Sequence, residues 1–158
     1  MKSWTYDNVV ASQHDSIWAT QPHNEIFLTD AFNSSRNVVL VFSVNTSKAF
    51  QGYVSISMYH VINRPLMIEQ ARMSSLPGEA PTPSWAKALI WPSSPPFYIE
   101  WITVAETHFR KVGHLKNNLN ENQAVLVGRD GQEIEAHCGR ALCERIDEES
   151  ERVARGGI

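Results

Sequence analysis

The chain has 158 residues, of which 42% are hydrophobic and 20% are charged, and its formal net charge at pH 7 is −3. This length and composition are typical of one folded domain and exclude an intrinsically disordered chain. Two cysteines are too few for a disulfide-stapled miniprotein, and the longest apolar run, residues 38–42, is far too short to span a membrane. With no secretory leader pattern at its start, the chain is expected to be a soluble domain of a reducing, intracellular compartment.

The net charge is unevenly distributed along the chain. Residues 1–132 carry ten basic and ten acidic side chains, whereas residues 133–158 carry four basic and seven acidic ones. This excludes a strongly cationic protein that binds nucleic acid without regard to sequence. A local basic groove is compatible with a neutral body, and an RNA partner would have to be held largely through its bases.

The N-terminal third predicts one helix and two strands. Asp7 is a suitable N-cap for a short helix over residues 8–15, in which apolar side chains recur at roughly helical spacing. Residues 37–44 are β-branched and apolar, which is typical of a buried strand. Residues 50–58 alternate in polarity and predict a half-buried strand beside it, after a short loop.

The remainder of the chain is more irregular. Residues 60–96 hold seven of the eight prolines, so regular structure is not expected over most of them. Residues 97–104 alternate and predict a strand, and residues 114–134 are polar, Asn-rich and turn-like. A last helix is expected from about residue 138 to 145, followed by a flexible tail over 150–158. Few helices and several short strands indicate an α+β or small-barrel domain.

No set of side chains in the sequence predicts catalysis or metal binding. Six histidines lack the spacing of metal ligands, and Cys138 and Cys143 have no second cysteine pair to complete a zinc site. We interpret these cysteines as packing residues of the last helix. The sequence contains no nucleophile elbow, phosphate-binding loop or dinucleotide fingerprint, so we expect no enzyme, no cofactor and no metal site.

The five tryptophans are the more informative residues. Trp101 lies in an alternating strand and is expected in the core, whereas Trp18 follows the first helix at a chain turn. Trp85 and Trp91 lie in the proline-rich segment. Loop aromatics on a rigid scaffold are what a base-stacking pocket needs, at about 1–3 kcal/mol per stacked base. Burial in the core is the alternative for each of them.

An ordered series of motifs resembles the YTH domain. These motifs are KSWTYDNV, SIWATQPHNEIFLTDAF, VVLVFSVNTSKAFQGYVSI, FYIEWITV, HLKNNLNE and GRDGQEI…CGRALCERI. The resemblance implies an α+β fold, a small mixed β-barrel of about six strands flanked by short helices, over residues 1–149 with its first strand truncated. It also implies binding of single-stranded RNA that carries N6-methyladenosine, with the methylated base in an aromatic cage.

The resemblance also implies which residues contact the methylated base. Trp18, in the I-W-A-T motif, is the first cage wall, and Trp85 and Trp91 are the second and third walls. Asn8 matches the residue that reads the adenine edge. The backbone carbonyl of Ala19 is expected to accept the remaining N–H of the methylated amine.

A second group of residues is implied to lie along the nucleotide and the RNA backbone. Lys2 and Ser3 match a K-S pair near the nucleotide. Arg129 and Asp130 match an R-D pair whose arginine holds a phosphate. Trp4 stands where many nuclear members of the family have Asn, so one base contact is lost there or replaced by stacking.

The resemblance predicts a non-catalytic, monomeric reader of N6-methyladenosine in mRNA. The GRDGQE and CG-x-x-LC motifs are similar to the nuclear branches, including the form associated with polyadenylation. We therefore expect a nuclear protein, with the cytoplasm as alternative, and the mRNA 3′-end processing complex as a partner. Two other functions stay open: a diverged module that binds unmethylated RNA or a protein through another face, and an enzyme acting on modified nucleotides, for which no residue speaks.

Overall fold

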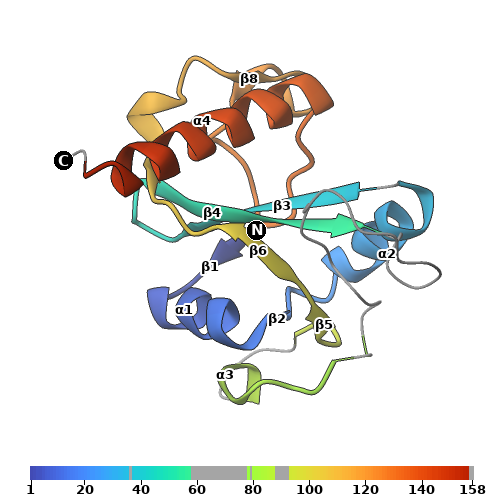
Figure 1. The fold of residues 1–158 in the computed structure, drawn as a ribbon. Coiled ribbons are helices and arrows are strands. Elements are labelled where there is room, and N and C mark those ends of the chain that lie inside the picture. The colour runs from blue at the N-terminus through green and yellow to red at the C-terminus, as the bar shows by residue number, and fades with distance from the viewer. Residues whose placement is uncertain (36, 58–77, 79, 88–92, 157–158) are drawn as a thin grey trace, which may run out of the picture. The chain divides into compact units, whose positions relative to one another are not determined.

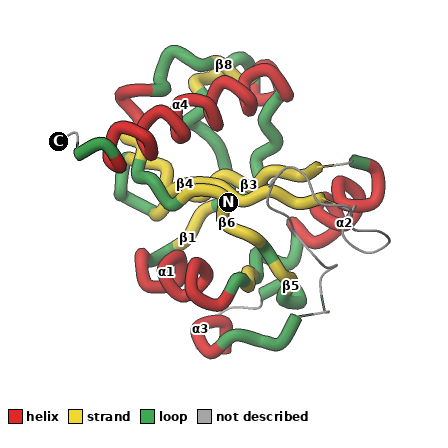
Figure 2. Tube along the Cα trace, in the orientation of Figure 1, coloured by secondary structure: helices red, strands yellow, loops and turns green. Residues whose placement is uncertain are grey.

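The computed structural model describes residues 1–35, 37–57, 78, 80–87 and 93–156 (Figure 1). Figure 2 shows the helices and strands that these residues form. The helices are α1 (Tyr6–Asp15), α2 (Asn24–Ser34), α3 (Ser84–Lys87) and α4 (Ala136–Ala154), with 3₁₀ turns η2 (Phe109–Lys111) and η3 (Asn118–Asn120). The strands are β1 (Lys2–Ser3), β2 (Ile17–Trp18), β3 (Asn37–Val44), β4 (Ala49–Ser57), β5 (Phe97–Tyr98), β6 (Glu100–Thr103), β7 (Thr107–His108), β8 (Lys116–Asn117) and β9 (Gln123–Ala124).

The strands form one mixed sheet and two short ladders. The main sheet has the order β1-β3-β4-β6, and β7 also pairs with β4. Strand β1 runs parallel to β3, with Lys2 opposite Ser43, whereas β7 is antiparallel to β4, with Thr107 opposite Phe50. The pairs β2–β5 and β8–β9 are antiparallel ladders of two strands each. The α+β class is confirmed; the described strands trace an open path and no closed barrel, so the barrel stays a prediction.

By its internal contacts the chain divides into two compact units. The first unit comprises residues 1–5, 41–53 and 103–158, and the second comprises residues 6–40 and 54–102.

Helix α4 provides the core of the first unit. Cys138, Leu142 and Ile146 recur every four residues and are buried on one face of the helix. They form a cluster with Val41, Phe50, Tyr53, Val112 and Val125. The interpretation of the cysteines as packing residues is confirmed, because Cys143 also packs against this cluster. Burial raises the pKa of the Cys143 thiol to about 12, so this thiol stays protonated and unreactive at neutral pH.

Helix α4 is longer than the sequence pattern predicts, since it ends at Ala154 and not near residue 145. The additional turns contain acidic and basic side chains at i,i+3 and i,i+4 spacing. Arg152 pairs with Glu149, and Arg155 pairs with Glu151, both at 2.9 Å. Such pairs stabilise a helix without an apolar face, which explains why the apolar periodicity stops earlier than the helix does. Among the described residues, no helix has the length and apolar character to cross a membrane.

The second unit shows one confirmed helix, two helices that were not predicted and one divided strand. The predicted helix over 8–15 is α1, but it begins at Tyr6, so Asp7 lies in its first turn and is not its N-cap. Helices α2 and α3 were not expected. Residues 97–104 form two strands and not one, because the Ile99 N–H donates to the Ser16 carbonyl at 2.9 Å between them. Strand β5 therefore pairs with β2, and β6 joins the main sheet.

Candidate nucleic-acid interface

Trp18 and Trp85 form an aromatic corner in the second unit. Their ring centroids lie 5.1 Å apart and their planes are inclined by 37°. Trp18, on β2, is only 3% exposed, whereas Trp85, on the single turn of α3, is half-buried. A base sandwiched between two parallel rings needs about 7 Å, twice a contact distance of about 3.5 Å. The two rings are therefore adjacent walls of one corner, and the space between them is too narrow to hold a base as a sandwich.

The position of Trp18 is fixed by hydrogen bonds of the backbone on both sides of it. In the β2–β5 ladder, Trp18 lies opposite Phe97. Beyond the ladder, the Ser94 N–H donates to the Thr20 carbonyl at 2.6 Å, and the Thr20 N–H donates to Ser94 Oγ at 3.1 Å. Asn24 Nδ2 donates to Thr20 Oγ1 at 2.9 Å.

The residues that form these hydrogen bonds beside Trp18 are all buried: Thr20, Asn24 and Ser94. Sequence reasoning did not name them. Their polarity close to aromatic residues in the sequence was the one available indication. No local sequence pattern shows which residues they bond to.

The remaining residues implied to surround the base are placed as follows. Ala19 follows Trp18 and is 4% exposed, so its peptide is part of the buried backbone behind the corner. Asn8 is half-buried on α1. Trp91 lies outside the described residues, so the third wall stays a prediction. Trp101, which was expected in the core, is half-buried, and its Nε1 donates to the buried Ser12 Oγ of α1 at 3.3 Å.

The indole N–H of Trp85 is a polar group that the corner leaves unsatisfied. It is buried and has no hydrogen-bond partner among the described residues. A buried donor without a partner costs about 1–3 kcal/mol.

The second group of implied residues lies in the first unit, on β1 and the turn before α4. The Lys2 N–H donates to Asp130 Oδ1 at 2.7 Å, so these two segments are joined. Ser3 is 3% exposed, and its hydroxyl donates to the Thr5 carbonyl at 2.9 Å. Lys2 and Arg129 are exposed cations, and Trp4 is an exposed aromatic residue at 61%.

The predicted site residues that the structure describes fall into two groups, one in each unit. Lys2, Ser3, Trp4, Arg129 and Asp130 belong to the first unit, and Asn8, Trp18, Ala19 and Trp85 belong to the second. The structure brings together Trp18 with Trp85 and Lys2 with Asp130. The roles of all ten residues stay predictions.

Comparison with known proteins connects this arrangement to a family. The sequence matches the YT521-B-like domain, YTH, over residues 1–147. It is 36% identical over 156 residues to YTH domain-containing protein 1 of Drosophila melanogaster, covering 96% of this chain and 19% of that protein. It is 30% identical over 152 residues to the 30-kDa cleavage and polyadenylation specificity factor 30 of Arabidopsis thaliana, covering 92% and 21%. The chain spans about a fifth of the length of these relatives.

A solved structure shows the same fold. The CPSF4 YTH domain of Toxoplasma, in complex with a 7-mer m6A-modified RNA, superposes with a TM-score of 0.77 at 27% sequence identity. The alignment covers 94% of this chain and 89% of that one. YTH domains are a non-catalytic RNA-binding family. Because the family match includes nearly all of the chain, this chain belongs to the YTH family.

Proposed function

We propose that this domain recognises N6-methyladenosine in single-stranded RNA, with the methylated base against the Trp18–Trp85 corner. The observation that supports this most directly is the contact of these two rings at 5.1 Å, formed by the two described tryptophans that the motif resemblance names. The likeness to the Toxoplasma domain, whose crystals contain m6A-modified RNA, supports the same ligand.

The energetics of such a corner are sufficient for discrimination. N6-methyladenine is neutral, so stacking, dispersion and desolvation of the methyl group replace full cation–π attraction. Burying one methyl-sized group contributes roughly 0.8 kcal/mol, and tight aromatic packing adds about 0.5–1.5 kcal/mol. Together these terms favour methylated over unmethylated adenosine by about 10- to 50-fold.

In the same proposal, polar groups of the second unit identify the base. Asn8 donates to the ring nitrogen of adenine, and the Ala19 carbonyl accepts the one N–H that methylation leaves. Trp91 supplies the third wall. A base that cannot satisfy these groups leaves them buried and unpaired, which penalises it.

The exposed groups of the first unit have a different proposed role. Lys2 and Arg129 contact RNA phosphate, and Trp4 stacks on a neighbouring base. Asp130 and Ser3 position β1 through the Lys2 N–H and the Thr5 carbonyl. Phosphate contacts set affinity and register but do not read the methyl group.

Paired titrations test this function. Two short RNAs that differ only in one N6-methyl group are titrated into the domain and followed by calorimetry and tryptophan fluorescence. We expect at least a tenfold preference for the methylated RNA, reduced to less than twofold in Trp85→Ala with its melting temperature retained. Trp101→Phe, which removes the indole that donates to Ser12 of α1, is the matched control and is expected to keep the preference.

Two outcomes contradict the proposal. Equal binding of both RNAs would favour the diverged module that binds unmethylated RNA. Unfolding of Trp85→Ala together with unchanged methyl preference in Trp18→Phe would make the rings core residues and not cage walls.

We also propose that the whole protein acts on mRNA in the nucleus, in contact with the 3′-end processing machinery. The name and 30% identity of the Arabidopsis polyadenylation factor support this partner. Imaging of the tagged full-length protein tests its location, and a purely cytoplasmic signal contradicts it.

A further inference from the structure

The outer face of α2 exposes two large apolar side chains next to each other. Ile26 is 69% exposed and Phe27 is 67% exposed, the two highest values among the exposed large hydrophobic residues of the described chain. Single exposed apolar residues are normal on a protein surface. Ile26 and Phe27 are consecutive and point about 100° apart around the helix, and together they form a broad apolar patch of the kind that marks interaction sites.

The fold does not need Ile26 or Phe27 to place α2. The opposite face of the helix buries Asn24, Leu28 and Phe32, which recur every four residues. Asn24 also anchors the first turn through its 2.9 Å hydrogen bond to Thr20 Oγ1. At about 100° per residue, Ile26 and Asp30 point about 160° away from the centre of this buried face, and Phe27 points about 100° away from it. The outer face is therefore not needed to hold α2 in place, because the contacts of the helix are on its other side.

The two charged side chains of α2 itself are both acidic. Asp30, one turn after Ile26, is exposed, and Glu25 is half-buried. Helix α2 contains these two carboxylates and neither Lys nor Arg. An acidic, apolar face repels RNA phosphate, and it also repels a second copy of itself. Complementarity therefore requires a partner that is apolar and cationic.

We propose that the outer face of α2, defined by Ile26, Phe27 and Asp30, binds a cationic amphipathic helix of another protein. The apolar ridge of the partner helix packs on Ile26 and Phe27, as ridges pack into grooves between helices. Lys or Arg side chains beside that ridge pair with Asp30. The domain thereby binds a protein on a face that takes no part in the proposed RNA site.

A designed peptide serves as the probe. It is a 16-residue helix with Leu at positions i, i+3 and i+4 of each seven-residue repeat and Lys at the positions that flank them. The comparison peptide has Glu in place of every Lys. Both are titrated into the ¹⁵N-labelled domain. We expect the Lys peptide to shift the amide signals of α2 and to bind at least tenfold more tightly than the Glu peptide.

Variants locate the binding face. Ile26→Gln with Phe27→Gln is expected to weaken the Lys peptide at least tenfold, and Asp30→Asn to weaken it severalfold and reduce its salt dependence. The matched control, Leu119→Gln with Val127→Gln, removes an exposed apolar pair from the first unit and leaves binding unchanged. Affinity for methylated RNA is expected to be the same in all these proteins.

Several results would overturn the proposal. The Lys peptide could fail to bind at millimolar concentration, or the two peptides could bind equally well. The Lys peptide could also bind the Ile26→Gln, Phe27→Gln variant as tightly as the wild type. Loss of RNA affinity in that variant would assign the face to RNA. Dimerisation of the wild-type domain in sedimentation, abolished by the same substitutions, would assign it to a second copy.

Discussion

The backbone N–H of Lys2 donates a 2.7 Å hydrogen bond to the carboxylate of Asp130, although the two residues are 128 positions apart. Strand β1 has only two residues paired with β3, at Ser43 and Val44. The Ser43 and Asn45 N–H groups of the neighbouring segment donate to the Met1 and Ser3 carbonyls at 2.9 Å, on either side of Lys2. The carboxylate of Asp130 adds a further link at Lys2 itself, from the turn before α4.

Asp130→Ala is therefore expected to loosen β1. The free energy of unfolding falls by about 1 kcal/mol, because the hydrogen bond is charge-assisted but exposed. Amide hydrogen exchange of Lys2 is expected to accelerate, and RNA affinity to fall without a change in methyl preference. Asp130→Asn retains an acceptor oxygen for the Lys2 N–H and serves as the control. If hydrogen exchange at Lys2 is unchanged in Asp130→Ala, Asp130 does not position β1.

Arg129→Ala is expected to weaken methylated and unmethylated RNA by the same factor. Arg129 is exposed beside the turn residue Asp130, and a phosphate contact has no information about the base. The slope of log affinity against log salt is expected to decrease by about 1. Titrations of both RNAs at several salt concentrations measure this, and a selective loss of methyl preference would assign Arg129 to the base instead.

Gly52→Ala is expected to be strongly destabilising, by about 3 kcal/mol or more. Gly52 in β4 has φ +104, and an added Cβ would overlap the carbonyl oxygen of Thr103 in β6. Neither backbone can withdraw without breaking the sheet. Thermal and urea unfolding measure the loss.

Gly139→Ala provides the matched control. Its added Cβ would meet Ile134 at an ordinary 3.7 Å, and Gly139 lies within α4. This variant is expected to stabilise the domain by about 0.5–1 kcal/mol, because alanine has the higher helix propensity. Similar losses in both variants would refute the close-approach argument.

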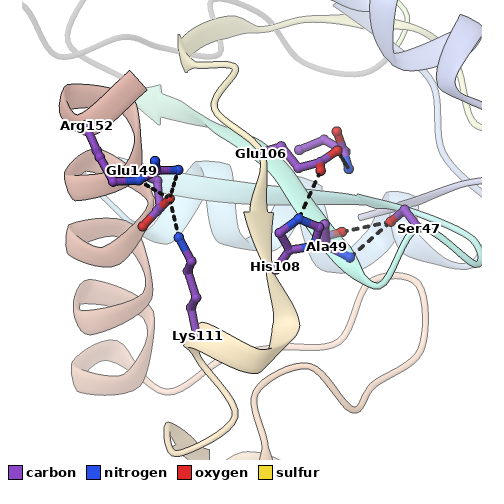
Figure 3. Close-up of polar contacts among 8 residues, drawn as sticks. Ser47, Ala49, Glu106, His108, Lys111, Glu149 and Arg152 are labelled. Carbon is purple, nitrogen blue, oxygen red and sulfur yellow. Dashed lines mark hydrogen bonds and ion pairs between the residues drawn. The ribbon is translucent and has the colours of Figure 1, made fainter. Parts of the chain in front are cut away.

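Glu149 is expected to make stability sensitive to acid. Lys111 Nζ lies 2.6 Å from its carboxylate and Arg152 lies 2.9 Å away (Figure 3). The hydrogen bond from Lys111, followed by that from Arg152, lowers the pKa of Glu149 below its ordinary 4.5. Because the pKa is lower in the folded state, the stabilisation is complete above about pH 4.5 and is lost as the pH falls through the folded value.

Unfolding at pH 7 and at pH 3 tests this linkage. Glu149→Gln is expected to be less stable than wild type at pH 7, by up to about 1 kcal/mol for a pair this near the surface. The difference is expected to shrink at pH 3. The comparison variant is Glu148→Gln, whose pairing with Arg145 is more exposed. A difference that stays constant with pH would exclude the ion-pair explanation.

The regular strands of this domain were predictable because their signal is local. The β-branched run over residues 37–44 has the same bounds as β3, and the alternating run over 50–58 agrees with β4 to within one residue. Helix α2 was missed because its buried stripe includes the polar Asn24, while Ile26 and Phe27 are exposed. A polar residue is buried there and two apolar residues are exposed, which is the reverse of the pattern by which a sequence indicates an amphipathic helix.

The aromatic corner could be predicted only in part. Trp18 and Trp85 were named through resemblance, and the structure places their rings in contact. The hydrogen bonds that hold Trp18 connect Thr20 to Ser94, and long-range pairing of this kind leaves no periodic pattern. The division of residues 97–104 between two sheets was unpredictable for the same reason, since it depends on the carbonyl of Ser16.

The 74-residue separation of Thr20 and Ser94 also determines when the corner can exist. On the ribosome, Trp18 leaves the exit tunnel long before the segment that pairs with it. Closing so large a loop costs entropy that only the later contacts repay. A nascent or prematurely terminated chain that lacks Phe97 retains both corner tryptophans but not the ladder that fixes them. Any activity that depends on the corner therefore requires the completed domain.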